Sequence, residues 1–136
     1  MTQPPHILIV DDNRDIRDAL VKYLEKNGMR ATSAANAVAM NAAMKVGQFD
    51  LIVLDVMMPD MNGYEVTRHL RKNPVTASIP ILLFTAKTQL EDKAAGFEVG
   101  ADDYLTKPTH PTELQSHVKT LLARTLQKPG NSEAVS

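Results

Sequence analysis

Hydrophobic residues in this chain form short unbroken runs separated by segments with helical spacing. Three runs of four consecutive apolar residues occupy residues 7–10, 51–54 and 81–84. Each run is too short for a helix and shows no polar alternation, which is the pattern of a strand covered on both faces of a parallel sheet. Two weaker strands are predicted over residues 29–34 and 101–105.

Amphipathic helices are predicted between these strands. In the clearest of these helices, apolar residues recur at i, i+3, i+4, i+7 and i+8: Ile16, Ala19, Leu20, Tyr23 and Leu24. Gly28 is placed to end this helix. The last helix begins at Pro111, which suits a first helical position, and carries Leu114, Val118, Leu121 and Leu122. Weaker helices fit residues 35–45, 63–72 and 89–99, the last closed by Gly100. This alternation of strands and helices predicts an α/β fold with a parallel sheet and helices on both faces.

Length and composition narrow the classes of function. The chain has 136 residues, enough for one domain, and we expect it to comprise residues 1–126, with residues 127–136 as a flexible tail or truncated linker. Without cysteine it has no disulfide, thiolate zinc site or cysteine nucleophile. A net charge of -1 lacks the basic excess expected of a nucleic-acid-binding chain, so we expect no direct nucleic acid binding. Apolar runs of four residues are too short to cross a bilayer, so we expect no membrane contact and a cytoplasmic protein.

Polar residues follow the predicted strands at the points where the strands end. Asp11 and Asp12 follow the first run, Asp55 the second, Thr85 the third, and Lys107 the fifth strand. Ligands bind outside the carboxyl ends of strands in open parallel sheets, so these groups are expected to converge. Three carboxylates around one point repel each other unless a hard cation joins them, and oxygen ligands suit Mg²⁺. A lysine would neutralise the charge of a transferred phosphoryl group, and a hydroxyl would donate a hydrogen bond to its equatorial oxygens.

Each of these residues also has an ordinary structural interpretation. Taken singly, Asp11 or Asp12 is better explained as a cap of the first helix. Thr85 alone would be an ordinary strand residue, and Lys107 alone a surface charge. The shared position at strand ends favours a joint site.

Four motifs carry a resemblance to a known family over residues 5 to about 125. They are IVDDN at 9–13, LDVMMPDMNG at 54–63, FTA at 84–86 and GADDYLTKP at 100–108. In this order they resemble the receiver domains of two-component response regulators, and are similar to the chemotaxis response regulator. The resemblance implies a flavodoxin-like fold whose five-stranded parallel sheet has the order 2-1-3-4-5.

The resemblance also implies roles for individual residues. Asp55 would be the phosphoacceptor, while Asp11, Asp12, Asp55 and the backbone carbonyl of Met57 would hold Mg²⁺. Thr85 and Lys107 would contact the phosphoryl oxygens, Tyr104 would be the switching aromatic that turns inward on phosphorylation, and Lys107–Pro108 would be a cis peptide. Met57 and Lys87 would flank the path of the water that hydrolyses the aspartyl phosphate.

The partners implied are a sensor histidine kinase or histidine phosphotransfer protein and a downstream output domain or protein. Phosphorylation-dependent homodimerisation is compatible with the same resemblance. Kinase recognition would involve the exposed face of the first helix, around Arg14, Asp15, Asp18 and Lys22, although such charges also suit a solvated surface. Beyond self-phosphorylation and self-dephosphorylation, we expect no enzyme activity.

Alternative functions are less compatible with the residues. A Mg²⁺-dependent aspartate-nucleophile phosphatase of the haloacid dehalogenase type carries Asp-x-Asp, whereas Met57 stands two residues after Asp55. An FMN carrier would place a phosphate loop after the first strand, where Asp11 and Asp12 would repel it. The chain could be a free-standing receiver or the amino-terminal receiver fragment of a larger regulator, and the linker-like composition of residues 127–136 favours the fragment.

Two departures from the family pattern concern the start of the last helix. Thr109 and His110 stand where an aromatic and often an acidic cap are usual. The four histidines, His6, His69, His110 and His117, have no partner at metal-ligand spacing and are interpreted as surface or packing residues.

Overall fold

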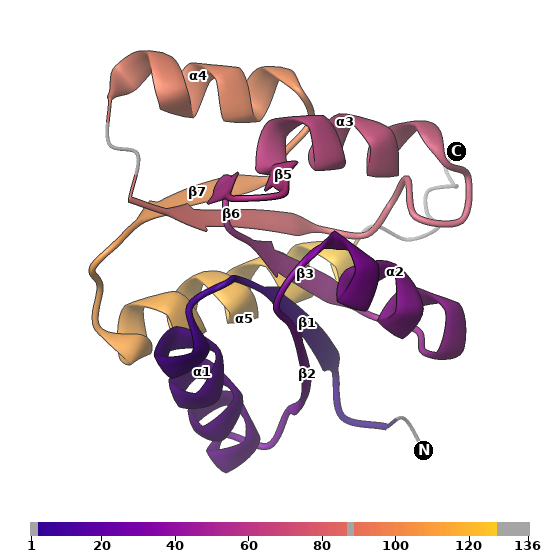
Figure 1. Ribbon diagram of the computed structural model, residues 1–136. Coiled ribbons are helices and arrows are strands. Elements are labelled where there is room, and N and C mark those ends of the chain that lie inside the picture. The colour runs from indigo at the N-terminus through magenta and orange to yellow at the C-terminus, as the bar shows by residue number, and fades with distance from the viewer. Residues whose placement is uncertain (1–2, 87–88, 128–136) are drawn as a thin grey trace.

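The computed structural model describes residues 3–86 and 89–127 and consists of a central parallel sheet between two layers of helices (Figure 1). Five strands form the sheet in the order β2-β1-β3-β6-β7, which is the predicted order once the short strands β4 and β5 are set apart. The strands are β1 (His6–Val10), β2 (Arg30–Ala34), β3 (Leu51–Leu54), β6 (Ile81–Thr85) and β7 (Asp103–Thr106). The helices are α1 (Arg14–Lys26), α2 (Ala37–Val46), α3 (Gly63–Lys72), α4 (Leu90–Glu98) and α5 (Pro111–Gln127). The predicted fold class is confirmed.

Both faces of the central strands are covered, which explains their unbroken apolar runs. Ile7 and Ile9 point into a core with α1 and α5, whereas Leu8 and Val10 point into a second core with α2 and α3. Alternate residues of one strand therefore enter two different cores, and a polar residue would be buried on either side. Figure 1 shows α1 and α5 on one side of the sheet and α3 and α4 on the other.

The helix boundaries follow local capping chemistry. Asn13 is the N-cap of α1, with its side-chain oxygen accepting a hydrogen bond from Ile16 N at 3.1 Å. The structure thus corrects the interpretation of Asp11 or Asp12 as a helix cap. Asn36 caps α2 in the same way, so this helix starts two residues later than predicted. Among the predicted apolar positions of α1, Ala19 is exposed.

Two glycines end helices as predicted, since Gly28 and Gly100 have positive φ angles of 85° and 110°. The amide of Ala101 still bonds back to the Gly96 carbonyl. The last strand therefore starts at Asp103, two residues later than the predicted one.

At the start of α5, Thr109 and His110 make the hydrogen bonds that an acidic cap would otherwise make. The Nδ1 atom of His110 accepts a hydrogen bond from Thr112 N at 3.2 Å, and the Thr109 hydroxyl donates to Glu113 at 2.6 Å. An imidazole nitrogen thus serves as the acceptor that an aspartate or serine oxygen usually supplies at a helix start. The helix runs to Gln127, the first residue of the predicted tail, and residues 128–136 lie outside the described residues.

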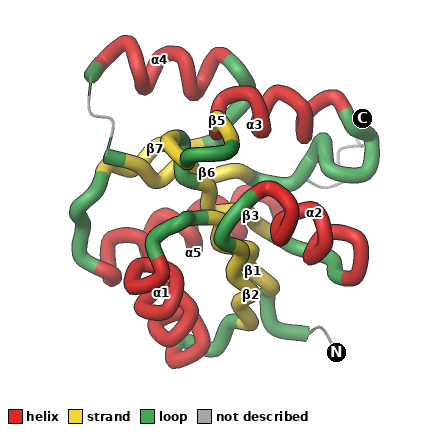
Figure 2. The backbone as a smooth tube through the Cα atoms, viewed as in Figure 1, coloured by secondary structure: helices red, strands yellow, loops and turns green. Residues whose placement is uncertain are grey.

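A short antiparallel pair lies between β3 and α3 and was not predicted. It consists of β4 (Met57–Met58) and β5 (Met61–Asn62) and lies beside the start of α3 (Figure 2). Gly63 follows it and packs so closely that an added Cβ would lie 2.6 Å from the carbonyl oxygen of Asp55. This close approach brings the start of α3 next to the end of β3. No helix among the described residues is long and apolar enough to span a membrane.

Candidate functional site

Asp11 and Asp55 lie side by side because their strands are neighbours in register. Val10 of β1 pairs with Leu54 of β3, and Asp55 N donates to the Val10 carbonyl at 2.9 Å. The two aspartates follow these strands directly, so both carboxylates emerge at the carboxyl edge of the sheet. Both are buried, with 2% and 6% of their surfaces exposed. Burial of two negative charges is costly unless cations or hydrogen bonds offset it.

Asp12 completes an acidic cluster with these two residues. One carboxylate oxygen from each of Asp11, Asp12 and Asp55 lies within 4.8 Å of the others, and Asp12 is the exposed member. An all-oxygen donor set of this size suits a hard divalent cation such as Mg²⁺. The three residues therefore fit the metal that the sequence implied, with Asp12 on the side open to solvent.

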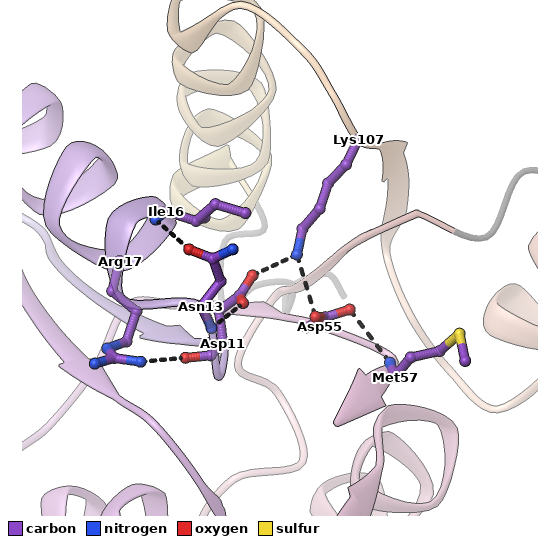
Figure 3. A network of polar contacts seen from close by, with 7 residues as sticks. All are labelled: Asp11, Asn13, Ile16, Arg17, Asp55, Met57 and Lys107. Atoms are coloured by element: carbon purple, nitrogen blue, oxygen red, sulfur yellow. Dashed lines mark hydrogen bonds and ion pairs between the residues drawn. The ribbon is translucent and has the colours of Figure 1, made fainter. Parts of the chain in front are cut away.

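Lys107 is the cation that contacts the two buried carboxylates. Its ammonium nitrogen lies 2.6 Å from Asp11 Oδ2 and 3.1 Å from Asp55 Oδ2 (Figure 3). The same nitrogen is 5.4 Å from the centre of the Phe84 ring, and the Lys107 side chain is 15% exposed. Lys107–Pro108 is a cis peptide, as predicted. The end of β7 thus brings a lysine across the sheet edge to β1 and β3.

Backbone groups orient the two buried carboxylates. Asn13 N donates to Asp11 Oδ1 at 2.9 Å, and Met57 N donates to Asp55 Oδ1 at 3.2 Å. Arg17, which the sequence analysis did not single out, donates from its guanidinium to the Asp11 carbonyl at 2.9 Å (Figure 3). These bonds leave Asp55 Oδ2 as the oxygen that faces Lys107.

Met57 lies at the solvent side of the site. Its side chain is 60% exposed and lines an open pocket of about 770 Å³. The pocket is also lined by Asp12, Val56, Met58, Pro59, Met61 and Asn62. An apolar thioether therefore lines the same pocket as Asp12, the exposed member of the acidic cluster. Lys87, the other residue predicted to influence hydrolysis, lies outside the described residues.

Thr85 and Tyr104 lie on the neighbouring strands β6 and β7. Thr85 ends β6 and is fully buried, and it pairs in register with Thr106 of β7. Tyr104 is 7% exposed, so its side chain is already inward in this structure. The response of Tyr104 to phosphorylation stays a prediction. Burial, and secondarily a hydrogen bond to Tyr64, raise the pKa of Tyr104 well above its usual range.

The histidines occupy packing and surface positions, as interpreted from the sequence. The His6 ring lies 4.5 Å from the Phe49 ring between centroids, and burial lowers the pKa of His6. His117 Nδ1 lies 2.5 Å from Asp103 Oδ2. Within the described ranges, neither histidine belongs to a cluster that could hold a metal.

Arg71 and Asp102 form a structural network that the sequence analysis missed. The Arg71 guanidinium donates to Asp102 Oδ2 at 2.6 Å and to the carbonyls of Gly100 and Ile79 at 2.8 and 2.6 Å. Asp102 Oδ2 also accepts a hydrogen bond from Ile81 N at 2.8 Å. The network ties the end of α3 to the starts of β6 and β7, at the edge of the sheet opposite the acidic cluster. The one sequence signal for this network was the presence of basic residues in the last turn of the predicted third helix.

Comparison with known proteins gives a consistent result. The family model for the response regulator receiver domain matches residues 7–119. The chain is 44% identical over 128 residues to the phosphate regulon transcriptional regulatory protein PhoB of Pseudomonas aeruginosa, covering 94% of this chain and 55% of that protein. It is 42% identical over 125 residues to the DNA-binding dual master transcriptional regulator RpaA of Synechocystis, covering 92% and 52%. The chain thus spans about half the length of these curated relatives.

Solved structures show the same similarity in three dimensions. The chemotaxis protein CheY4 of Vibrio cholerae superposes with a TM-score of 0.82 at 32% identity, covering 87% of this chain and 98% of that one. A CheY-like response regulator receiver domain protein of Methanospirillum hungatei gives a TM-score of 0.84 at 30% identity, covering 91% and 98%.

Proposed function

Since this chain belongs to the response regulator receiver domains of two-component signalling, we propose that Asp55 is its phosphoacceptor and that Lys107, Thr85 and the acidic cluster serve the transfer. The observation that carries the proposal is the contact of Lys107 with both Asp11 and Asp55. Residues that follow three different strands meet there at one point, although Lys107 is 96 positions from Asp11 and 52 from Asp55 in sequence.

In the proposed reaction, Asp55 attacks the phosphorus of a phosphohistidine or a small acyl phosphate. The new bond joins the carboxylate oxygen to phosphorus, and the bond from phosphorus to the donor's nitrogen or oxygen breaks with its electron pair. A freed imidazole takes its proton from water, and a freed carboxylate needs none. The carboxylate is the attacking group, and the Lys107 ammonium lies 3.1 Å from its Oδ2 atom.

Asp11, Asp12, Asp55 and the Met57 carbonyl are the proposed ligands of Mg²⁺. When bound, Mg²⁺ would neutralise negative charge on the acceptor and on the incoming phosphoryl group. Lys107 then has its own role, because its ammonium can turn from the Asp11 carboxylate to a phosphoryl oxygen. Thr85 would donate its hydroxyl proton to a second phosphoryl oxygen.

The proposed partners are a histidine kinase or histidine phosphotransfer protein as donor and an output domain or protein as receiver of the signal. The relatives PhoB and RpaA are described as transcriptional regulators, and this chain matches 55% and 52% of their lengths. Their length supports an output domain in a longer protein, with this chain acting on it through a switching surface. We propose no catalytic turnover beyond the domain's own phosphorylation and dephosphorylation.

Intact-mass spectrometry after incubation with acetyl phosphate tests this function. The protein should gain the mass of one phosphoryl group with Mg²⁺ and none with EDTA, and Asp55→Asn should gain none. Asp50→Asn is the matched control, because Asp50 precedes the same strand that Asp55 follows and its carboxylate accepts a hydrogen bond from His6 N at 2.8 Å. A gain in Asp55→Asn equal to that of the unsubstituted protein would overturn the assignment.

A further inference from the structure

Tyr64, at the start of α3, contacts the two elements that would carry the signal away from Asp55. Its amide is held by the N-cap, since Tyr64 N donates to Asn62 Oδ1 at 2.8 Å. Its hydroxyl reaches across to α4 and donates to the Asp92 carbonyl at 2.9 Å. The same hydroxyl lies 3.4 Å from the hydroxyl of Tyr104 on β7. One phenol thus links α3, α4 and β7.

The proton count fixes the direction of the contact between the two tyrosines. A phenol has a single hydroxyl proton, and the carbonyl of Asp92 can only accept. The Tyr64 proton is therefore used toward Asp92. In the contact between the hydroxyls, Tyr104 donates and the Tyr64 oxygen accepts. At 3.4 Å this is a long bond, so the link from Tyr64 to α4 is the stronger of the two.

The described side chains of helix α4 are largely outside the core. Among the α4 residues whose burial the structure describes, Gly96 is the buried one, and Phe97 is 49% exposed. A Cβ added at Gly96 would lie 2.9 Å from the Tyr104 ring and 2.9 Å from the Leu83 side chain. The backbone of α4 therefore lies directly on the Tyr104 ring. A group that binds the backbone of α4, as the Tyr64 hydroxyl does, should therefore help to hold this helix in place.

We propose that Tyr64 is a positioning residue that holds Tyr104 inward and α4 against the sheet before any phosphorylation. The inference rests on the proposed function where it treats Tyr104 as the switching residue, but its structural part concerns the unphosphorylated protein alone. With Tyr64 in place, the surface of α4 and β7 already has the conformation in which Tyr104 is buried. Loss of the Tyr64 hydroxyl removes the hydrogen bond to the Asp92 carbonyl and one contact of the Tyr104 hydroxyl.

Amide hydrogen exchange of Tyr64→Phe tests the proposal in the free protein. The substitution keeps the ring and removes only the hydroxyl, so amides of α4 should exchange about fivefold faster, the effect of losing one hydrogen bond. The chain has three tyrosines, so ring carbon NMR resolves each of them, and the Tyr104 signal should shift. The matched control is Tyr23→Phe on α1, across the sheet, which should change neither measurement.

Unchanged exchange in α4 together with an unchanged Tyr104 signal in Tyr64→Phe would overturn the proposal. Beryllofluoride with Mg²⁺, which mimics a phosphoryl group, separates it from the proposed function. Exchange of α4 should slow more in Tyr64→Phe than in the unsubstituted protein, where the helix is already held. A fivefold difference in the free proteins with no beryllofluoride response in either supports the role of Tyr64 and counts against the function proposed for Asp55.

Discussion

The Lys107 ammonium lies closer to Asp11 than to Asp55, at 2.6 Å from the first carboxylate and 3.1 Å from the second. Both carboxylates are buried, so one cation offsets two negative charges that would otherwise repel each other. The same two carboxylates are proposed ligands of Mg²⁺. The metal and the ammonium must therefore share the site or compete for it.

Replacing Lys107 with methionine should tighten Mg²⁺ binding. The substitution removes a positive charge a few ångströms from the metal site but keeps an apolar side chain of similar length, and we expect the affinity to rise at least about tenfold. Phosphorylation by acetyl phosphate should slow in the same variant, because a phosphoryl contact is lost. Isothermal titration calorimetry measures the affinity, with Lys45→Met on the exposed side of α2 as control. Weaker Mg²⁺ binding in Lys107→Met would show that the ammonium does not oppose the metal.

Met57→Asn should shorten the life of the aspartyl phosphate. The exposed thioether at Met57 is a weak acceptor and cannot orient an attacking water, whereas an amide can. We expect single-turnover loss of phosphate to become about fivefold faster, as one water-orienting hydrogen bond would give. Met57→Leu, which keeps an apolar side chain, should retain the original rate. Equal rates in Met57→Asn and Met57→Leu would exclude this position from control of hydrolysis.

The sheet and the edge carrying the site could be predicted because both depend on local sequence patterns. Unbroken apolar runs mark strands covered on both faces, and residues after such strands reach the same edge. This reasoning alone predicts that Asp11, Asp55 and Lys107 lie close together. In the structure, Lys107 contacts both aspartates. Resemblance to the receiver family added the roles of single residues, which spacing does not provide.

Other features lacked a local signal. The hairpin of β4 and β5 has only two residues in each strand, too few for any periodicity. The contact between Tyr64 and Tyr104 joins residues 40 positions apart, and nothing near either residue distinguishes a buried phenol from a half-exposed one. For the same reason the inward position of Tyr104 could not be anticipated, since it depends on the packing of Gly96 against its ring.

Gly63→Ala should destabilise the fold, because the added methyl group would clash with the backbone of Asp55 and Val56. A Cβ at Gly63 would lie 2.6 Å from both Asp55 O and Val56 Cα, and neither atom can move as a flexible side chain does. We expect a loss of about 1–3 kcal/mol in the free energy of unfolding. Gly47→Ala is the control, because its nearest contacts are 3.5 Å or longer and its φ is -134°. Urea denaturation measures both, and equal stability of the two variants would contradict the close packing at Gly63.

Gln115→Leu should stabilise the protein. Gln115 is buried on α5, and neither its side-chain nitrogen nor its side-chain oxygen has a hydrogen-bond partner among the described residues. An unsatisfied buried amide is costly, so an apolar side chain of similar size should add about 1 kcal/mol to the free energy of unfolding. Gln48→Leu, at an exposed position, should change it by less than about 0.5 kcal/mol. Lower stability in Gln115→Leu on urea denaturation would indicate that the amide has a partner in solution.

In the proposed reaction Asp55, and neither of its two acidic neighbours, carries the phosphoryl group. Borohydride reduction converts an aspartyl phosphate to homoserine, so peptide mass spectrometry after acetyl phosphate and Mg²⁺ locates the modified residue. We predict homoserine at position 55 in the protein and at no position in Asp55→Asn. Homoserine at position 11 or 12, or its persistence in Asp55→Asn, would show that Asp55 is not the phosphoacceptor.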